Sequence, residues 1–336
     1  MSCSRILVAS VLVVVASVGH AATVVEAAGA TFPYPIYAKW FEAFHRHFPD
    51  FEIRYQAIGS EGGIQQLIQR KVDFAASDVP LSSIEVGGGS GYVQFPAVLG
   101  AVVPIYNVPR VSGAMQFTPE ALAGIYLGNI KRWNDPALKA ANRGVSLPDE
   151  DIVVVHRSDG SGTSYIWTEY LSKALSAWKS TVGARTLPAW PVGRGADGND
   201  GIAKLVSQTA NSIGYVEFIY AIQNRLNFGA VRNQAGKFIQ ADLDSIAEAA
   251  TGATARFSPD LGISITNAPG LRAYPISSFS WFIVPTRIED AARKKVILEF
   301  LKWMLGPGQK QAAALGYVSL PNELVVRENQ LLDNQK

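Results

Sequence analysis

The sequence predicts an α/β fold with mainly parallel sheets, and two observations carry this prediction. Strand-like and helix-like segments alternate along the chain, which is typical of strand–helix–strand units. The chain also has 336 residues, of which 48% are hydrophobic and 17% are charged. Because that is enough to build one large core or two ordinary ones, we expect an ordered protein with two domains.

The elements of the N-terminal third follow from their periodicity. Between residues 35 and 48, apolar side chains recur at helical spacing, whereas residues 51–58 alternate as in a strand. Prolines within residues 95–109 exclude a helix there. The elements expected in this part are, in order, a strand at 23–27, a helix at 35–48, a strand at 51–58, a helix at 61–72, a strand at 72–78 and an extended run at 95–109.

Capping signals define helices in the rest of the chain. Thr118 is a suitable N-cap and Pro119 a suitable first residue for a helix over 118–128. Asn199 or Asp200 would cap a helix that runs to residue 208. The other expected elements are a strand at 151–157, a helix at 160–175, a strand-like run at 212–221, a strand at 277–285 and an amphipathic helix at 292–305.

The N-terminus has the pattern of a signal peptide over residues 1–22. Arg5 precedes an apolar stretch from Ile6 to Val18, and small residues then offer a cleavage site after Ala21 or Ala22. The alternative is a short anchor helix, but the stretch is short for a membrane span. Cys3 is the only cysteine and precedes the apolar stretch, so we expect neither a lipid anchor nor a disulfide in the mature chain.

Charge and motifs argue against nucleic-acid binding and against several enzyme classes. Without residues 1–22, which contain Arg5 and no acid, 29 basic residues face 28 acidic ones, so no excess of basic charge is present. The G-x-G-x-x-G match at 193–198 follows two prolines, which disfavour the strand that a dinucleotide site needs. His45 and His47 would point in different directions on a helix, and His156 has no partner histidine nearby in the sequence, so we expect no metal site and no cofactor.

A different pattern occurs three times: a strand ends, small or hydroxyl residues follow, and a helix begins. The three turns lie at 29–35, 58–66 and 158–166, and the last one carries Arg157 at its edge. Free backbone N–H groups and the positive end of the helix dipole favour anions at such turns. One turn alone could be an ordinary helix cap. Three turns at the carboxyl ends of strands in one α/β protein favour an oxyanion site.

Several long motifs resemble one family. The segments "AGATFPYPIYAKW", "IGSEGGIQQLI", "VDFAASDVPLS", "IYLGNIKRWND", "RSDGSGTSYIWTEYL" and "GNDGIAKLVSQ" are similar, in this order, to the periplasmic phosphate-binding proteins of high-affinity phosphate ABC importers, the PstS family. The resemblance implies a type II, two-domain periplasmic-binding-protein fold. It places domain I at 23–104 and 275–336, domain II at 105–274, and two hinge strands between them with the ligand in the interdomain cleft.

The resemblance also implies a set of ligand residues. Asp78 would accept a hydrogen bond from a proton of the phosphate, and Asp159 would hold the Arg157 guanidinium from behind. Glu61 departs from the family pattern, in which a small residue follows the serine, and we expect its side chain to point to solvent. The residues expected to contact phosphate are Thr31, Phe32, Ser60, Asp78, Arg157, Ser161, Gly162 and Thr163.

The resemblance finally implies what the protein does. It would be a monomeric periplasmic solute-binding protein that captures inorganic phosphate and delivers it to the transmembrane and ATPase subunits of an ABC importer. Two alternatives remain. One is another tetrahedral oxyanion, such as sulfate or molybdate, which Asp78 disfavours. The other is a secreted phosphatase, which would need a metal cluster or a nucleophile with its base, and the sequence displays neither.

Overall fold

The computed structural model describes residues 22–81, 91–111, 113–251 and 261–333. The expected signal peptide at 1–22 therefore lies almost wholly outside the described residues. The first elements are β1 (Thr23–Gly29), α1 (Tyr34–His47), β2 (Phe51–Ala57), α2 (Ser60–Ile68), β3 (Phe74–Ser77), β4 (Tyr92–Asn107), β5 (Gln116–Phe117), α3 (Pro119–Tyr126) and α4 (Pro136–Ala141). The next are β6 (Val153–Arg157), α5 (Gly162–Ala174), α6 (Ser176–Thr181), β7 (Arg194–Ala196), α7 (Gly198–Gln208), β8 (Ser212–Glu217) and α8 (Phe218–Gln223). The last are β9 (Asn227–Phe228), β10 (Ala230–Arg232), β11 (Phe238–Ile239), α9 (Leu243–Ala250), β12 (Ser277–Pro285), α10 (Ala291–Trp303), three short turns of helix within Met304–Leu315, and α11 (Asn322–Asp333).

The main sheet is parallel at its two ends and antiparallel in the middle. Its strand order is β2-β1-β3-β12-β4-β8-β6-β7, with β9 pairing to β4, and a small sheet has the order β11-β10-β5. β1 is parallel to β2 and β3, and β6 is parallel to β7 and β8. β12 and β4 pair antiparallel with each other and with their outer neighbours. The predicted parallel pairing is thus correct for the two ends of the sheet and wrong for its centre.

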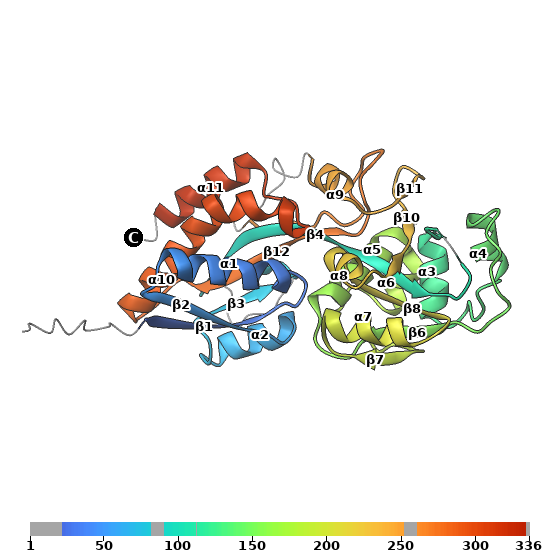
Figure 1. Ribbon diagram of the computed structural model, residues 1–336, viewed down its shortest axis with the longest axis horizontal. Helices are drawn as coiled ribbons and strands as arrows, with labels where there is room; N and C mark the ends of the chain where they lie inside the picture. Colours follow the sequence, from blue (N-terminus) through green and yellow to red (C-terminus); the bar gives the residue numbers. More distant parts are fainter. Residues whose placement is uncertain (1–21, 82–90, 112, 252–260, 334–336) are drawn as a thin grey trace, which may run out of the picture.

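Two groups of elements lie on either side of this centre (Figure 1). One contains β1, β2 and β3 with α1, α2, α10 and α11, and the other contains β6, β7 and β8 with α3, α5 and α7. β4 runs through both groups, because it pairs with β12 up to Ala101 and with β8 from Val102 onward. The chain therefore passes from one group to the other in the middle of one long strand.

Two local predictions need correction. The strand-like run at 212–221 breaks after Glu217, where α8 begins, because the Glu217 carboxylate accepts a hydrogen bond from the Ile219 N–H and caps that helix. Asn199 and Asp200, the predicted N-caps of the next helix, lie inside α7, which begins at Gly198 after the N-cap residue Asp197. The Thr118 cap and the helix that it opens are confirmed, since its hydroxyl accepts from the Ala121 N–H at 3.1 Å.

The core holds the strand ends in fixed positions. The apolar stripe of α1 is buried as its spacing predicts, and Tyr37 stacks on Phe282 of β12 with ring centroids 4.4 Å apart. α2 packs on β1 and β3, while α7 packs on β6 and β8. These contacts leave the carboxyl ends of β1, β3 and β6 directed at the boundary between the two groups.

Candidate functional site

The three hydroxyl-rich turns meet at this boundary, together with two residues that follow or end strands. We call the two sides the N-terminal turns (Thr31, Phe32, Ser60 and Asp78) and the central turns (Arg157, Ser161, Gly162 and Thr163), and the whole set the buried polar cluster. All of these residues are buried, and Asp78 and Arg157 are 1% exposed. The structure thus brings together every residue of the predicted ligand set.

Asp78 and Ser60 form the polar centre of the N-terminal turns. Ser60, the first residue of α2, accepts from the Asp78 N–H at 3.1 Å and lies 3.5 Å from Asp78 Oδ2. The other carboxylate oxygen, Oδ1, accepts from Ser280 Oγ at 2.7 Å. Ser280 lies on β12, about two hundred residues further along the chain, so sequence reasoning did not connect it with Asp78.

Burial changes the acidity of Asp78. Removal of the carboxyl group from water raises its pKa from 3.8 to about 7, although hydrogen bonds from Ser280 and Ser60 and the charge of Arg157 oppose the rise. The side chain is therefore ionised above about pH 7 and protonated below it. In the ionised form it can only accept hydrogen bonds, and in the protonated form it can donate one.

Arg157 supplies the positive charge of the central turns. It is the one Lys or Arg side chain that is buried among the described residues. Its guanidinium donates two hydrogen bonds to the carboxylate of Asp159, as the sequence comparison implied, and its Nη1 lies 3.4 Å from Thr163 Oγ1. This bidentate ion pair fixes the plane of the guanidinium and offsets most of its charge.

The start of α5 completes the central turns. Ser161 is the N-cap, and its hydroxyl accepts from the Ser164 N–H at 3.0 Å. Gly162 and Thr163 follow in the first turn, where backbone N–H groups have no partner within the helix. The turn therefore presents free donors and the positive end of the helix dipole to the cluster.

The two sides touch so closely that a side chain at residue 162 would not fit. A Cβ atom built on Gly162 would lie 2.3 Å from Ser60 Oγ and 2.5 Å from Asp78 Oδ2. Gly59 has a φ of 88°, and a Cβ there would lie 2.7 Å from Asp159 Oδ2. The backbone of each side is thus in contact with polar atoms of the other.

Two buried residues that the sequence did not assign to the site also reach Thr31. Asn199 Nδ2 donates to Thr31 Oγ1 at 2.8 Å and to Thr163 Oγ1 at 3.1 Å, and Tyr220 Oη donates to the carbonyl of Thr31 at 2.7 Å. Asn199 lies within the quoted "GNDGI" motif, but its position at a helix start suggested only a cap. The motif could therefore have indicated that Asn199 belongs to the site, whereas no sequence pattern indicated the same for Tyr220.

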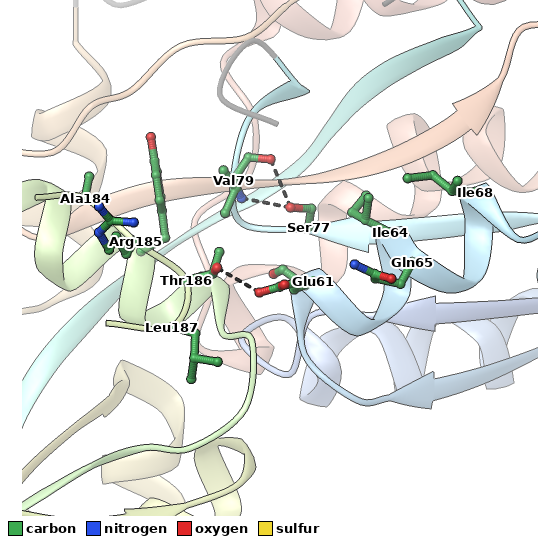
Figure 2. A pocket seen from close by; sticks show the side chains of 12 residues that line it. Glu61, Ile64, Gln65, Ile68, Ser77, Val79, Ala184, Arg185, Thr186 and Leu187 are labelled. Atoms are coloured by element: carbon green, nitrogen blue, oxygen red, sulfur yellow. Dashed lines mark hydrogen bonds between the residues drawn. The ribbon is translucent and has the colours of Figure 1, made fainter. Parts of the chain in front are cut away.

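A groove of about 570 Å³ opens from the rim of the site. Figure 2 shows that its walls come from α2 on one side and from the segment around Arg185 and Leu187 on the other. Glu61 is exposed, as expected, but it is not free in solvent, because Thr186 Oγ1 donates to its carboxylate at 2.9 Å across the groove. The residue that departs from the family pattern therefore joins the two sides at the rim.

The described residues contain no group of three or more histidines, cysteines or acids that could hold a metal ion. His45 contacts the carbonyl of Phe51 at the surface, and His156 stacks on Trp190 with ring centroids 5.3 Å apart. Within the same part of the chain, no helix has the length and apolarity that a membrane crossing requires.

Comparisons with known proteins agree with the expected family. A PBP superfamily domain matches residues 16–307. The chain is 42% identical to the phosphate-binding protein PstS of Pasteurella multocida, over 90% of this chain and 88% of that protein. It is 44% identical to PstS of Xylella fastidiosa, over 90% of this chain and 82% of that protein, and 34% identical to PstS of Methanocaldococcus jannaschii, over 90% and 83%.

Solved structures support the fold. A periplasmic phosphate-binding protein (PfluDING) bound with phosphate matches with a TM-score of 0.70 and 21% identity, over 92% of this chain and 93% of that one. A putative phosphate transporter substrate-binding protein from Clostridium perfringens matches with a TM-score of 0.62 and 20% identity, over 89% and 100%. The two-domain periplasmic-binding-protein fold is thereby confirmed. With its relatives identical at 42–44% over nine tenths of its length, the chain belongs to the PstS family of phosphate-binding proteins.

Proposed function

We propose that this protein captures inorganic phosphate in the buried polar cluster and delivers it to the permease of a phosphate ABC importer. The observation that carries the proposal is the convergence of three anion-binding turns, Arg157 and one carboxyl group in a single buried site. The names of its relatives point to the same ligand.

The cluster has the donors that a desolvated anion needs. Taking an ion out of water costs several kcal/mol unless it is paired and hydrogen-bonded. Here the donors are backbone N–H groups at the starts of α1, α2 and α5, the hydroxyls of Thr31, Ser60 and Thr163, and one guanidinium. Since Arg157 is already paired with Asp159, the site binds its anion mainly through neutral donors.

Asp78 would select phosphate over sulfate. An ionised carboxylate repels an anion unless a proton lies between them. Phosphate near neutral pH still carries a proton that it can donate to Asp78, whereas sulfate carries none. A site built around a required hydrogen bond strongly rejects an analogue that lacks it.

The domain division follows from the same proposal. Domain I would comprise 23–104 and 275–336 and domain II 105–274, so that the N-terminal turns and the central turns belong to different domains. The change of partner along β4, from β12 to β8 between Ala101 and Val102, supports a boundary near this point. Phosphate would then favour the closed form, because only that form makes contacts from both sides.

The setting of the protein is the periplasm. The apolar N-terminal stretch at 6–18 supports export, with removal of residues 1–22 as a signal peptide. The mature protein would act as a monomer and dock on an inner-membrane complex of two transmembrane proteins and their ATPase subunits. It would carry no cofactor and bind no nucleic acid.

Two other functions can be tested in the same experiment. One is a phosphatase, and the other is a carrier of sulfate or molybdate. The protein is unfolded and refolded to remove bound anions, and its thermal unfolding is followed with phosphate, with sulfate, with molybdate and without ligand. We expect phosphate alone to raise the melting temperature strongly near pH 8, and a phosphomonoester to remain intact. Release of phosphate from the ester, or equal stabilisation by sulfate, would contradict the proposal.

A further inference from the structure

Asn199 lies outside the expected ligand set, yet it is fully buried inside the cluster. It occupies the first turn of α7, but it does not cap that helix, since the N-cap is Asp197. Its side chain instead reaches three other segments: the turn after β1, the start of α5 and the end of β8.

The orientation of the Asn199 amide follows from its partners. Its Oδ1 accepts from the backbone N–H of Glu217 at 2.9 Å. A backbone N–H can only donate, so the oxygen of the amide must face Glu217 and the nitrogen must face the opposite way. The two hydrogens of Nδ2 are then directed at two threonine hydroxyls, Thr31 Oγ1 at 2.8 Å and Thr163 Oγ1 at 3.1 Å.

This arrangement decides what the threonine hydroxyls can do. A hydroxyl has one hydrogen to donate and two lone pairs that accept. Thr163 Oγ1 accepts from Asn199, and the Arg157 guanidinium lies beside it at 3.4 Å as a second donor. Thr31 Oγ1 likewise accepts from Asn199. Each hydroxyl therefore keeps its own hydrogen free to donate to an acceptor. The oxygens of an oxyanion are such acceptors.

We propose that Asn199 is a positioning residue of the site, which holds the Thr31 and Thr163 hydroxyls as hydrogen-bond donors toward the anion. The inference rests on the proposed phosphate binding and deepens it. Asn199 does not have to touch the ligand; it acts through the two threonines. Because Thr31 and Thr163 come from opposite sides of the cluster, the same amide also joins the two sides when they close.

The test is a double-mutant cycle with calorimetric titration of inorganic phosphate into the refolded full chain. Asn199→Ala is expected to weaken phosphate binding by roughly tenfold or more. In a Thr163→Val background, the loss caused by Asn199→Ala should be smaller by at least about threefold, because one of the two hydroxyls to be oriented is gone. Equal losses in the two backgrounds would overturn the proposal.

A matched control separates positioning from general support of α7. Asn107 also donates two hydrogen bonds from its amide, to the carbonyls of Val206 and Ser207 at the other end of α7, at 3.1 Å each. Asn107→Ala should lower the melting temperature and leave phosphate affinity within about twofold of the unaltered protein. If it weakens phosphate binding as much as Asn199→Ala does, destabilisation of α7 explains the loss and the proposal fails.

Two further provisions keep the result interpretable. If Asn199→Ala does not fold, Asn199→Ser replaces it in the cycle. Serine keeps a polar group near the Glu217 N–H but is too short to reach both threonines. The same loss of phosphate affinity, reduced in the Thr163→Val background, is then expected. If the unaltered protein binds no phosphate, the proposed function fails and this inference fails with it. If the protein binds phosphate and the cycle is additive, only the role of Asn199 is refuted.

Discussion

The two sides of the site meet in two regions that differ in their surroundings. In the buried polar cluster, Asn199 joins Thr31 to Thr163, and Gly162 lies against Ser60 with no room for a Cβ atom. At the rim, Glu61 and Thr186 make a hydrogen bond of similar length on an exposed surface. A polar contact is worth little where water can replace it, whereas an unpaired polar group in a buried site is costly. The inner region should therefore decide which anion binds, and the rim should only adjust affinity.

The largest difference in phosphate affinity is expected when one charged side chain is removed from each region in turn. Arg157→Ala deletes the buried guanidinium and leaves the Asp159 carboxylate without its partner. We expect phosphate affinity to fall by about 1.5–3 kcal/mol or more, which is the range for hydrogen bonds to charged groups. Calorimetric titration measures the loss.

Arg185 is the matched control for this substitution, because it lines the rim groove and is exposed. Arg185→Ala should change phosphate affinity by less than about 1 kcal/mol. Equal losses of phosphate affinity in Arg157→Ala and Arg185→Ala would mean that burial does not make the inner region more important for binding than the rim.

A second test uses the lack of space at Gly162. Gly162→Ala places a methyl group within 2.5 Å of Ser60 Oγ and Asp78 Oδ2, so that the two sides cannot approach fully. We expect a loss of about 1–3 kcal/mol in phosphate affinity, as for overpacked interiors, and weaker compaction by phosphate in small-angle scattering. Gly91→Ala is the control, since a Cβ at Gly91 meets nothing within 4 Å. Full compaction and unchanged affinity in Gly162→Ala would show that the sides need not touch.

The smallest effect is expected at Glu61. Glu61→Gln removes a negative charge near an anion site and keeps the shape of the side chain. Phosphate should bind up to about threefold more tightly at low salt, and the gain should disappear at high salt, because the group is exposed and its field is screened. A gain that persists at high salt would place Glu61 in the buried region rather than at the rim.

The sequence predicts the cluster well where chemistry and local structure coincide. Ser161 and Ser60 stand at helix starts that small residues and apolar spacing mark, so their positions follow from the sequence. The break between β8 and α8 does not follow from the sequence. Residues 212–221 are apolar or small throughout except for Glu217, and that residue is itself the cap of α8. Ser280 reaches Asp78 through a tertiary contact over a long stretch of chain, and no local pattern encodes such a contact. The motif around Asn199 is visible in the sequence, but its contact with Thr31 is again a tertiary one that the motif does not encode.

Selection by Asp78 is the central claim, and its pH dependence tests it most directly. Burial raises the Asp78 pKa to about 7, so sulfate can be accepted only when this carboxyl is protonated and supplies the hydrogen itself. Above about pH 7, sulfate affinity should therefore fall by roughly tenfold per pH unit. Phosphate in its dianionic form brings its own proton to the ionised carboxylate, so its affinity should stay nearly constant over the same range.

The measurement is the ratio of phosphate to sulfate affinity between pH 6 and pH 9, by calorimetric titration of the refolded protein and of Asp78→Asn at constant ionic strength. The account predicts that the ratio rises by roughly tenfold per pH unit above about pH 7 in the unaltered protein. In Asp78→Asn, which has an uncharged amide that can donate to sulfate, the ratio should be small and almost independent of pH. A ratio that does not change with pH in the unaltered protein, or the same strong exclusion of sulfate by Asp78→Asn, would contradict it.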